Sequence, residues 1–125
     1  MSTWLELAED NRIAAQELLG KGRFRSSISR SYYAAYCAVT YVLEGKVTYA
    51  YGRNNPTHED VPRYIVSNLP DVEADRRRNA KKAYQMLLEA RVDADYRPGM
   101  TCDRDLAMKA RKASERVLLE VRVRR

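Results

Sequence analysis

A charged pair near the end of a long helical pattern is the part of this sequence with the clearest chemical potential. The segment RVDADY at 91–96 places Arg91 and Asp95 four residues apart, so on a helix a guanidinium and a carboxylate can pair. The pair stands where the apolar, core-facing row of that helix should continue. An arginine fork suits a phosphate, and a tyrosine such as Tyr96 suits a base or a ribose. The segment therefore suggests a site for a nucleotide-like ligand.

A second unusual stretch is SRSYYAAY at 29–36, which crowds tyrosines and an arginine into two helical turns. Tyrosine hydroxyls need hydrogen-bond partners when they are buried. One interpretation places a single cleft between these segments, with ligand-binding residues Arg30, Tyr32, Tyr33, His58, Arg91, Asp95 and Tyr96. The alternative is structural: Arg91 and Asp95 form a partly buried ion pair that satisfies the hydroxyls and fixes the packing of two helices. His58 likewise has a simpler explanation as a hydrogen-bonding residue at a helix start. The sequence leaves these alternatives open.

An enzymatic interpretation needs a general base. RNA cleavage through the 2′-hydroxyl requires a group that accepts a proton near neutral pH, and His58 is the only histidine in the chain. Arg91 would then stabilise phosphate charge, so Arg91 and His58 are the candidate catalytic residues. The sequence has no Ser-His-Asp order, no Gly-rich phosphate loop and no carboxylate cluster for a metal. These features favour a protein that is not an enzyme.

The cysteines do not indicate a metal site or a disulfide framework. Cys37, Cys102 and His58 could in principle supply three zinc ligands, but no close pair such as Cys-x-x-Cys anchors a site. Cys37 is more simply explained as a small buried apolar residue. We therefore expect no metal and no cofactor.

Hydrophobic periodicity predicts the helices that must position these residues. The expected fold class is all-α: an antiparallel up-and-down bundle of four long helices plus one short helix, in a single domain spanning 1–125. Thr3 and Glu6 have capping-box spacing, Thr57 is a plausible cap for the short helix, and Thr101 or Asp103 for the last. The expected helices span about 3–19, 25–43, 57–68, 71–95 and from that last cap to about Val123.

The helix predicted at 25–43 is apolar on most sides, which is typical of a central, buried helix. Its alanines let neighbouring backbones approach, while its tyrosines fill the space between them. Because this surface is too extensive for its neighbours to cover easily, we expect a homodimer. In the loop that follows, at 45–56, Val47, Tyr49 and Tyr51 alternate, so a short extended piece is possible.

The chain is basic, with a formal net charge of +6. Its local concentrations of positive charge are Arg76–Arg78 with Lys81 and Lys82, and the tail at 122–125. These are either solvated helix faces or a patch that binds RNA or phosphate. No apolar run approaches membrane-spanning length, and the N-terminal sequence lacks a signal-peptide pattern, so we expect a cytoplasmic protein that makes no membrane contact.

Several of these segments together resemble one known family. RFRSSISRSYYAAYCAVTYVLEGK at 23–46, then THEDV at 57–61, then EARVDADY at 89–96, is similar to the HEPN family (higher eukaryotes and prokaryotes nucleotide-binding domain). The similarity extends from about Ala8 to Val121. Its most specific parts are SRSYYAAY and RVDADY, and His58 just before a short helix is a third match.

The resemblance implies an all-α bundle that usually dimerises. Members are often encoded beside a minimal nucleotidyltransferase, and some are toxins that cut RNA with an Arg-x4–6-His motif. Arg91 matches that arginine, but Asp95, Tyr96 and Arg97 follow and no histidine occurs there. The chain thus looks like the branch without the ribonuclease motif. We expect an accessory or nucleotide-binding subunit that works with a minimal nucleotidyltransferase in a toxin–antitoxin-like pair. The alternatives are a metal-independent RNA-cleaving toxin and a basic RNA-binding helical module.

Overall fold

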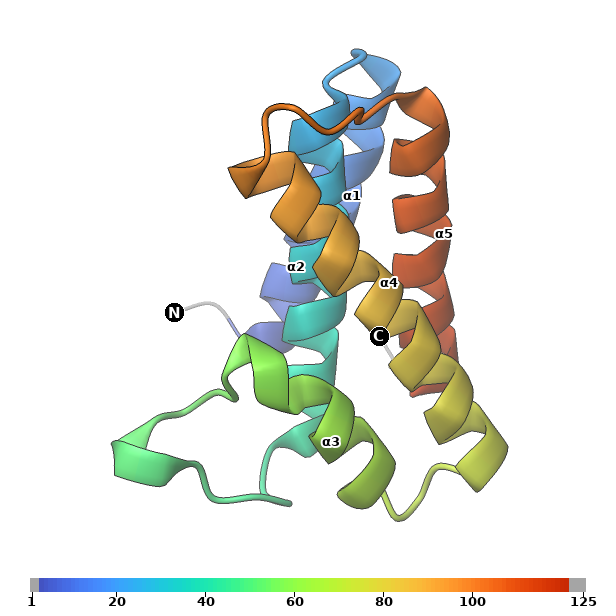
Figure 1. Ribbon diagram of the computed structural model, residues 1–125. Helices are drawn as coiled ribbons and strands as arrows, with labels where there is room; N and C mark the ends of the chain where they lie inside the picture. Colours follow the sequence, from blue (N-terminus) through green and yellow to red (C-terminus); the bar gives the residue numbers. More distant parts are fainter. Residues whose placement is uncertain (1–2, 122–125) are drawn as a thin grey trace.

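Five α-helices build the protein in a computed structural model that describes residues 3–121 (Figure 1). Two short 3-10 helices lie between the second and third of them, and residues 3–121 contain no β-strand. The prediction of an all-α bundle with four long helices and one short helix is confirmed. The elements are α1 (Trp4–Gly20), α2 (Phe24–Leu43), η1 (Ala50–Gly52), η2 (His58–Asp60), α3 (Val61–Ser67), α4 (Ala74–Tyr96) and α5 (Arg104–Glu120).

α2 is the central helix, and it packs against each of the other four α-helices (Figure 1). Ala34, Ala35 and Ala38 are all fully buried, which lets the neighbouring helices approach its backbone closely, and Tyr32 is fully buried between them. The prediction of a buried central helix is thus correct. A single chain already covers this helix, so the reason given for a homodimer loses its force and the dimer stays a prediction.

Side chains cap two of the helices as predicted. Thr3 Oγ1 accepts a hydrogen bond from the Glu6 backbone N–H at 3.1 Å, and the Asp103 carboxylate accepts one from Leu106 at 3.0 Å. Thr57 makes no capping hydrogen bond, so that prediction is wrong. The segment after it begins as η2 before α3 starts, and a proline in the first turn of α3 removes one donor that a cap would satisfy.

Two other features differ from the expectation, the start of α4 and the conformation of the loop after α2. α4 begins at Ala74, after a turn at 70–72, rather than at about 71. In the loop after α2, Tyr49 is extended but forms no strand, and η1 follows it directly, with Tyr51 at a φ of 57°, in the left-handed region. A strand cannot pass through that conformation, so the alternating residues did not indicate one. The predicted end of the last helix at Val123 lies outside the described residues.

An arginine from α2 caps the C-terminal end of α4 by hydrogen bonding to its carbonyl groups. Arg25 Nη1 donates to the backbone carbonyls of Asp93, Ala94 and Arg97, at 3.0 to 3.2 Å, and its Nη2 donates to those of Pro98 and Met100. The last carbonyls of a helix have no partner inside it, so this one side chain satisfies carbonyls at the C-terminal end of α4. It also fixes the α4–α5 connection beside the start of α2 (Figure 1).

The basic run at 76–78 is largely engaged in similar contacts. Arg76 donates to the carbonyls of Leu119 and Glu120 at the end of α5, and Arg77 donates to the carbonyl of Leu69 at 3.2 Å. Arg78 pairs with an aspartate one turn earlier on α4. These three arginines therefore hold helix ends and neighbouring turns, while Lys82 in the same predicted patch stays exposed.

Candidate functional site

The segments at 29–36 and 91–96 meet where α4 crosses α2. Arg91 Nε donates to Asp95 Oδ2 at 3.2 Å, and its Nη2 donates to the hydroxyls of Tyr33, at 3.0 Å, and Tyr96, at 3.3 Å. Ser29 on α2 donates to the same Asp95 oxygen at 3.2 Å. We call these five residues the Arg91 cluster. It joins the two helices through hydrogen bonds centred on one guanidinium.

Aromatic rings surround the guanidinium of Arg91, but not all of its N–H donors make hydrogen bonds. Its Cζ lies 5.3 to 5.5 Å from the ring centroids of Tyr32, Tyr33 and Tyr96, within cation–π range. The side chain is 13% exposed, and its Nη1 makes no hydrogen bond to any residue in the range 3–121. Tyr96 is 66% exposed, so the cluster opens to solvent beside an aromatic ring. An anion arriving there would find two free N–H donors.

A chain of hydrogen bonds runs from behind the cluster to the only histidine. The Tyr84 and Tyr32 hydroxyls are 2.6 Å apart, and the Tyr32 hydroxyl lies 2.5 Å from His58 Nδ1. Burial raises the pKa of both tyrosines far above the usual value, so both stay protonated. Either hydroxyl could donate in the Tyr84–Tyr32 bond, but the arrangement that leaves no buried O–H unpaired has Tyr84 donating to Tyr32 and Tyr32 donating to His58 Nδ1.

This direction of hydrogen bonding fixes the state of His58. Burial lowers the pKa of the imidazole, and the positive charges of Arg91 and Arg53 lower it further, so the neutral form is favoured. Its Nδ1 accepts from Tyr32, and the hydrogen of the neutral ring is then on Nε2. Neither nitrogen is free to take a proton from a substrate. The geometry therefore favours the structural interpretation of His58 over a general base.

The other predicted site residues divide into two groups. Tyr33, Arg91, Asp95 and Tyr96 are in direct contact, and Tyr32 joins them through its ring while its hydroxyl reaches His58. Arg30 points elsewhere: it is exposed and donates to Asn11 Oδ1 on α1 at 3.1 Å.

Sequence reasoning missed two members of this network, Ser29 and Tyr84. Ser29 lies four residues before Tyr33 on α2, and Tyr84 lies seven residues before Arg91 on α4. Both spacings keep the side chains on one helix face, which is the signal that could have identified them.

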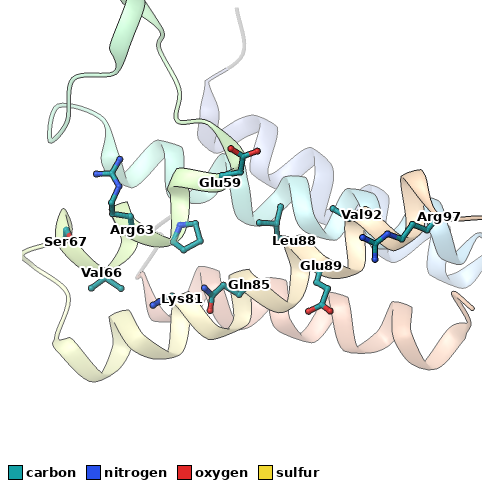
Figure 2. Close-up of a pocket in the computed structure, with 11 residues that line it drawn as sticks. Glu59, Arg63, Val66, Ser67, Lys81, Gln85, Leu88, Glu89, Val92 and Arg97 are labelled. Atoms are coloured by element: carbon teal, nitrogen blue, oxygen red, sulfur yellow. The ribbon is translucent and has the colours of Figure 1, made fainter. Parts of the chain in front are cut away.

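A separate groove lies beside the cluster without containing any predicted site residue. It measures about 780 Å³ between α3 and α4, and Leu88, Val92 and Val66 form its apolar part (Figure 2). Charges of both signs line it, with Arg63, Lys81 and Arg97 nearly balanced by Glu59 and Glu89. This mixture gives the groove no preference for an anion.

No three His, Cys, Asp or Glu side chains in the described part of the chain are grouped so as to hold a metal ion. Cys37 is buried, which raises the pKa of its thiol to about 11, as expected for a small core residue. None of the helices in the described range has the length and apolar character needed to cross a membrane.

The fold and the cluster define a small all-α bundle domain in which arginine–tyrosine hydrogen bonds join two long helices. The sequence profile of the HEPN domain matches residues 1–124. The chain therefore belongs to the HEPN domain family, as its motifs indicated. A comparison with curated proteins gave no significant match.

If the Arg91 cluster holds α2 and α4 together, Arg91→Ala should lower the free energy of unfolding by about 2 kcal/mol, because the half-buried Tyr33 hydroxyl and the Asp95 carboxylate lose a charged donor. Arg78→Ala is the matched control, since it removes an exposed arginine that pairs with Asp75 on the same helix. The control should cost at most about 0.5 kcal/mol. Urea denaturation measures both, and equal effects would contradict the packing role.

Stability should depend on pH through His58. The pKa of His58 in the folded chain lies below its usual 6.5, so the unfolded chain takes up the proton first as the pH falls. The stability contributed by neutral His58 is therefore fully present above that value and declines as the pH falls through it. In His58→Gln the amide oxygen can still accept the hydrogen bond from Tyr32, but the side chain no longer titrates. The free energy of unfolding of this variant should therefore change less with pH than that of the wild type between about pH 7.5 and 5.5. Urea denaturation at each pH measures the effect, and a wild-type urea midpoint that rises as the pH falls from about 7.5 to 5.5 would refute this.

Proposed function

We propose that this HEPN domain is a binding or accessory subunit that holds a nucleotide-like ligand at the Arg91 cluster and does not cut RNA. The observation that carries the proposal is the pair of unused N–H donors on Arg91 Nη1, beside the exposed ring of Tyr96. Most of this guanidinium is held in place by protein groups, and its Nη1 has no hydrogen-bond partner within residues 3–121. Membership of a family whose domains typically bind nucleotides or act on RNA is consistent with it.

The chemistry of the cluster suits a phosphate joined to a ring. Arg91 Nη1 can donate to phosphate oxygens, and a guanidinium fixed by Asp95 and Tyr33 needs little reorganisation to do so. Tyr96 offers a face on which a base can stack and a hydroxyl that can contact a ribose. The Asp95 carboxylate disfavours a ligand that brings further negative charge to its side of the cluster.

The RNA-cleaving alternative is less well supported. Arginine does not accept a proton at neutral pH, and His58 Nδ1 is already the acceptor for Tyr32. No histidine follows Arg91 at the position that the family motif requires. A nuclease built on this cluster would have no general base.

We also propose a partner, a minimal nucleotidyltransferase acting with this chain in a toxin–antitoxin-like pair, and a homodimer as the form of the domain itself. The support for both is the family resemblance. A nucleotidyltransferase encoded next to the gene would favour the first proposal, and co-purification of the two products would test it. For the second, we expect light scattering to give twice the mass of one chain, and a monomer from micromolar to millimolar concentration would refute it.

AMP is the probe for the proposed ligand site. We expect Arg91→Ala to weaken AMP binding at least tenfold, about 1.4 kcal/mol, because the phosphate loses a charged donor. Adenosine, which lacks the phosphate, should bind the wild-type chain more weakly than AMP does. Arg78→Ala serves again as the control and should leave binding unchanged. Isothermal titration calorimetry measures these affinities. Equal AMP affinity in the wild type and Arg91→Ala would exclude the Arg91 cluster as the binding site for AMP.

The purified protein should not cleave single-stranded or structured RNA in the absence of metal, since the cluster holds no free base. Gel analysis of labelled RNA is the measurement, with His58→Ala and Arg91→Ala as parallel samples. Cleavage by the wild type that disappears in both variants would make this chain a ribonuclease with a relocated base. Cleavage that survives both changes would come from a contaminant.

A further inference from the structure

A second surface, on the other side of α4, has the character of a polyanion site. The basic groove between α4 and α5 has a volume of about 460 Å³ and is lined by Lys82 and Met86 from α4 and by Lys109, Lys112 and Arg116 from α5. We propose that this basic groove binds the phosphate backbone of single-stranded RNA. The Arg91 cluster lies about 140° around α4 from Met86, so the two sites face different directions.

Three of the four cations in the basic groove have no ion-pair partner among the described residues. No carboxylate is among its lining residues, and Lys82, Lys112 and Arg116 are exposed with no ion-pair partner within residues 3–121. Lys109 lies 3.7 Å from Asp105, but both side chains are well exposed, so the pair is weak and can exchange for another anion. Four cations facing one groove repel one another, and an anion between them removes that repulsion. The mixed charges of the α3–α4 groove offer no such gain.

The cations form a row rather than a single point. Lys109, Lys112 and Arg116 are three and four residues apart on one face of α5, which corresponds to steps of about 4.5 and 6 Å along the helix. Lys82 stands across the groove on α4, which packs side by side with α5 (Figure 1). A row of about 10 Å suits a ligand with repeated phosphates better than it suits one free phosphate or a mononucleotide.

The lining also indicates which polyanion fits. Helices in contact have axes about 8 to 10 Å apart, and the furrow between two such helices admits one nucleic-acid strand more readily than a duplex. No aromatic side chain lines the groove to stack on a base, so recognition would be through the backbone and independent of sequence. Asn79, at one end of the groove, offers an uncharged donor and acceptor, the kind of group that can recognise a ribose 2′-hydroxyl.

Fluorescence anisotropy with a labelled oligouridine of about 15 nucleotides tests the proposal, at about 50 and 200 mM salt. The groove variant combines Lys82→Gln, Lys112→Gln and Arg116→Gln. The control variant removes three exposed cations elsewhere, with Lys21→Gln, Arg23→Gln and Lys46→Gln. We expect the groove variant to bind at least tenfold more weakly than wild type. It should also reduce the slope of log affinity against log salt by about 2, since about 0.7 counterions are released per phosphate contact.

Equal losses in the groove and control variants would overturn the proposal, because total charge alone would then explain binding. The second variant is Lys112→Glu, a single change at an exposed position, and it should also weaken the binding of oligouridine. The double variant Lys82→Arg with Lys112→Arg keeps the positive charges and should keep the affinity for oligouridine. This result would show that the loss in the groove variant comes from the missing charge and not from a change in folding at these positions. Oligodeoxyuridine of equal length should bind more weakly, and equal binding would refute the assignment to RNA. Excess AMP and Arg91→Ala should leave oligouridine binding unchanged, and loss in either would place the RNA at the Arg91 cluster instead.

Discussion

The hydroxyl of Tyr32 lies at the centre of the bundle without access to water, and the arrangement around it follows from the need to satisfy that group. Leaving such a hydroxyl without a partner would cost about 1 to 3 kcal/mol. Tyr84 brings α4 to it and His58 brings η2, so one side chain of α2 determines where two other elements must lie. Two further buried hydroxyls on α2, those of Ser27 and Tyr36, bond to backbone carbonyls in α1 and at Pro56. Apolar burial drives the bundle together, but these hydrogen bonds select one packing from the many that apolar contacts would allow.

Arg91 extends the same network to the surface, and this explains why the structural and ligand-binding interpretations do not compete. Its Nε and Nη2 hold Asp95, Tyr33 and Tyr96, while its Nη1 is left over. A guanidinium that is already fixed on two sides loses little conformational freedom when an anion binds to the third. The contacts that join the two helices would therefore also preorganise the arginine for the ligand that we propose.

Periodicity was sufficient to predict the helices, because each follows from the spacing of apolar residues along one segment. The contact between Tyr33 on α2 and Arg91 on α4 was one of the interpretations that the sequence left open, and spacing along a helix does not determine it. Periodicity could not predict which neighbour lies across a given face. Arg30 is close in sequence to Tyr33, yet it faces α1 and bonds to Asn11. The role of Arg25 was equally hidden, since a side chain that donates to backbone carbonyls leaves no pattern of partner residues in the sequence. Thr57 failed as a cap because its sequence context matched a helix start, whereas a 3-10 turn intervenes.

The clamp formed by Arg25 on the end of α4 has a consequence for local unfolding. The terminal turn of a helix ordinarily frays at little cost, and here that turn carries Asp95 and Tyr96. Because Arg25 holds carbonyls of this turn from the start of α2, opening the turn also requires these side-chain hydrogen bonds to break. We therefore expect amide protons at the end of α4 to exchange more slowly than those of a helix end without such a partner. The side chain of Arg25 thus restrains the exposed helix end that carries the proposed ligand site.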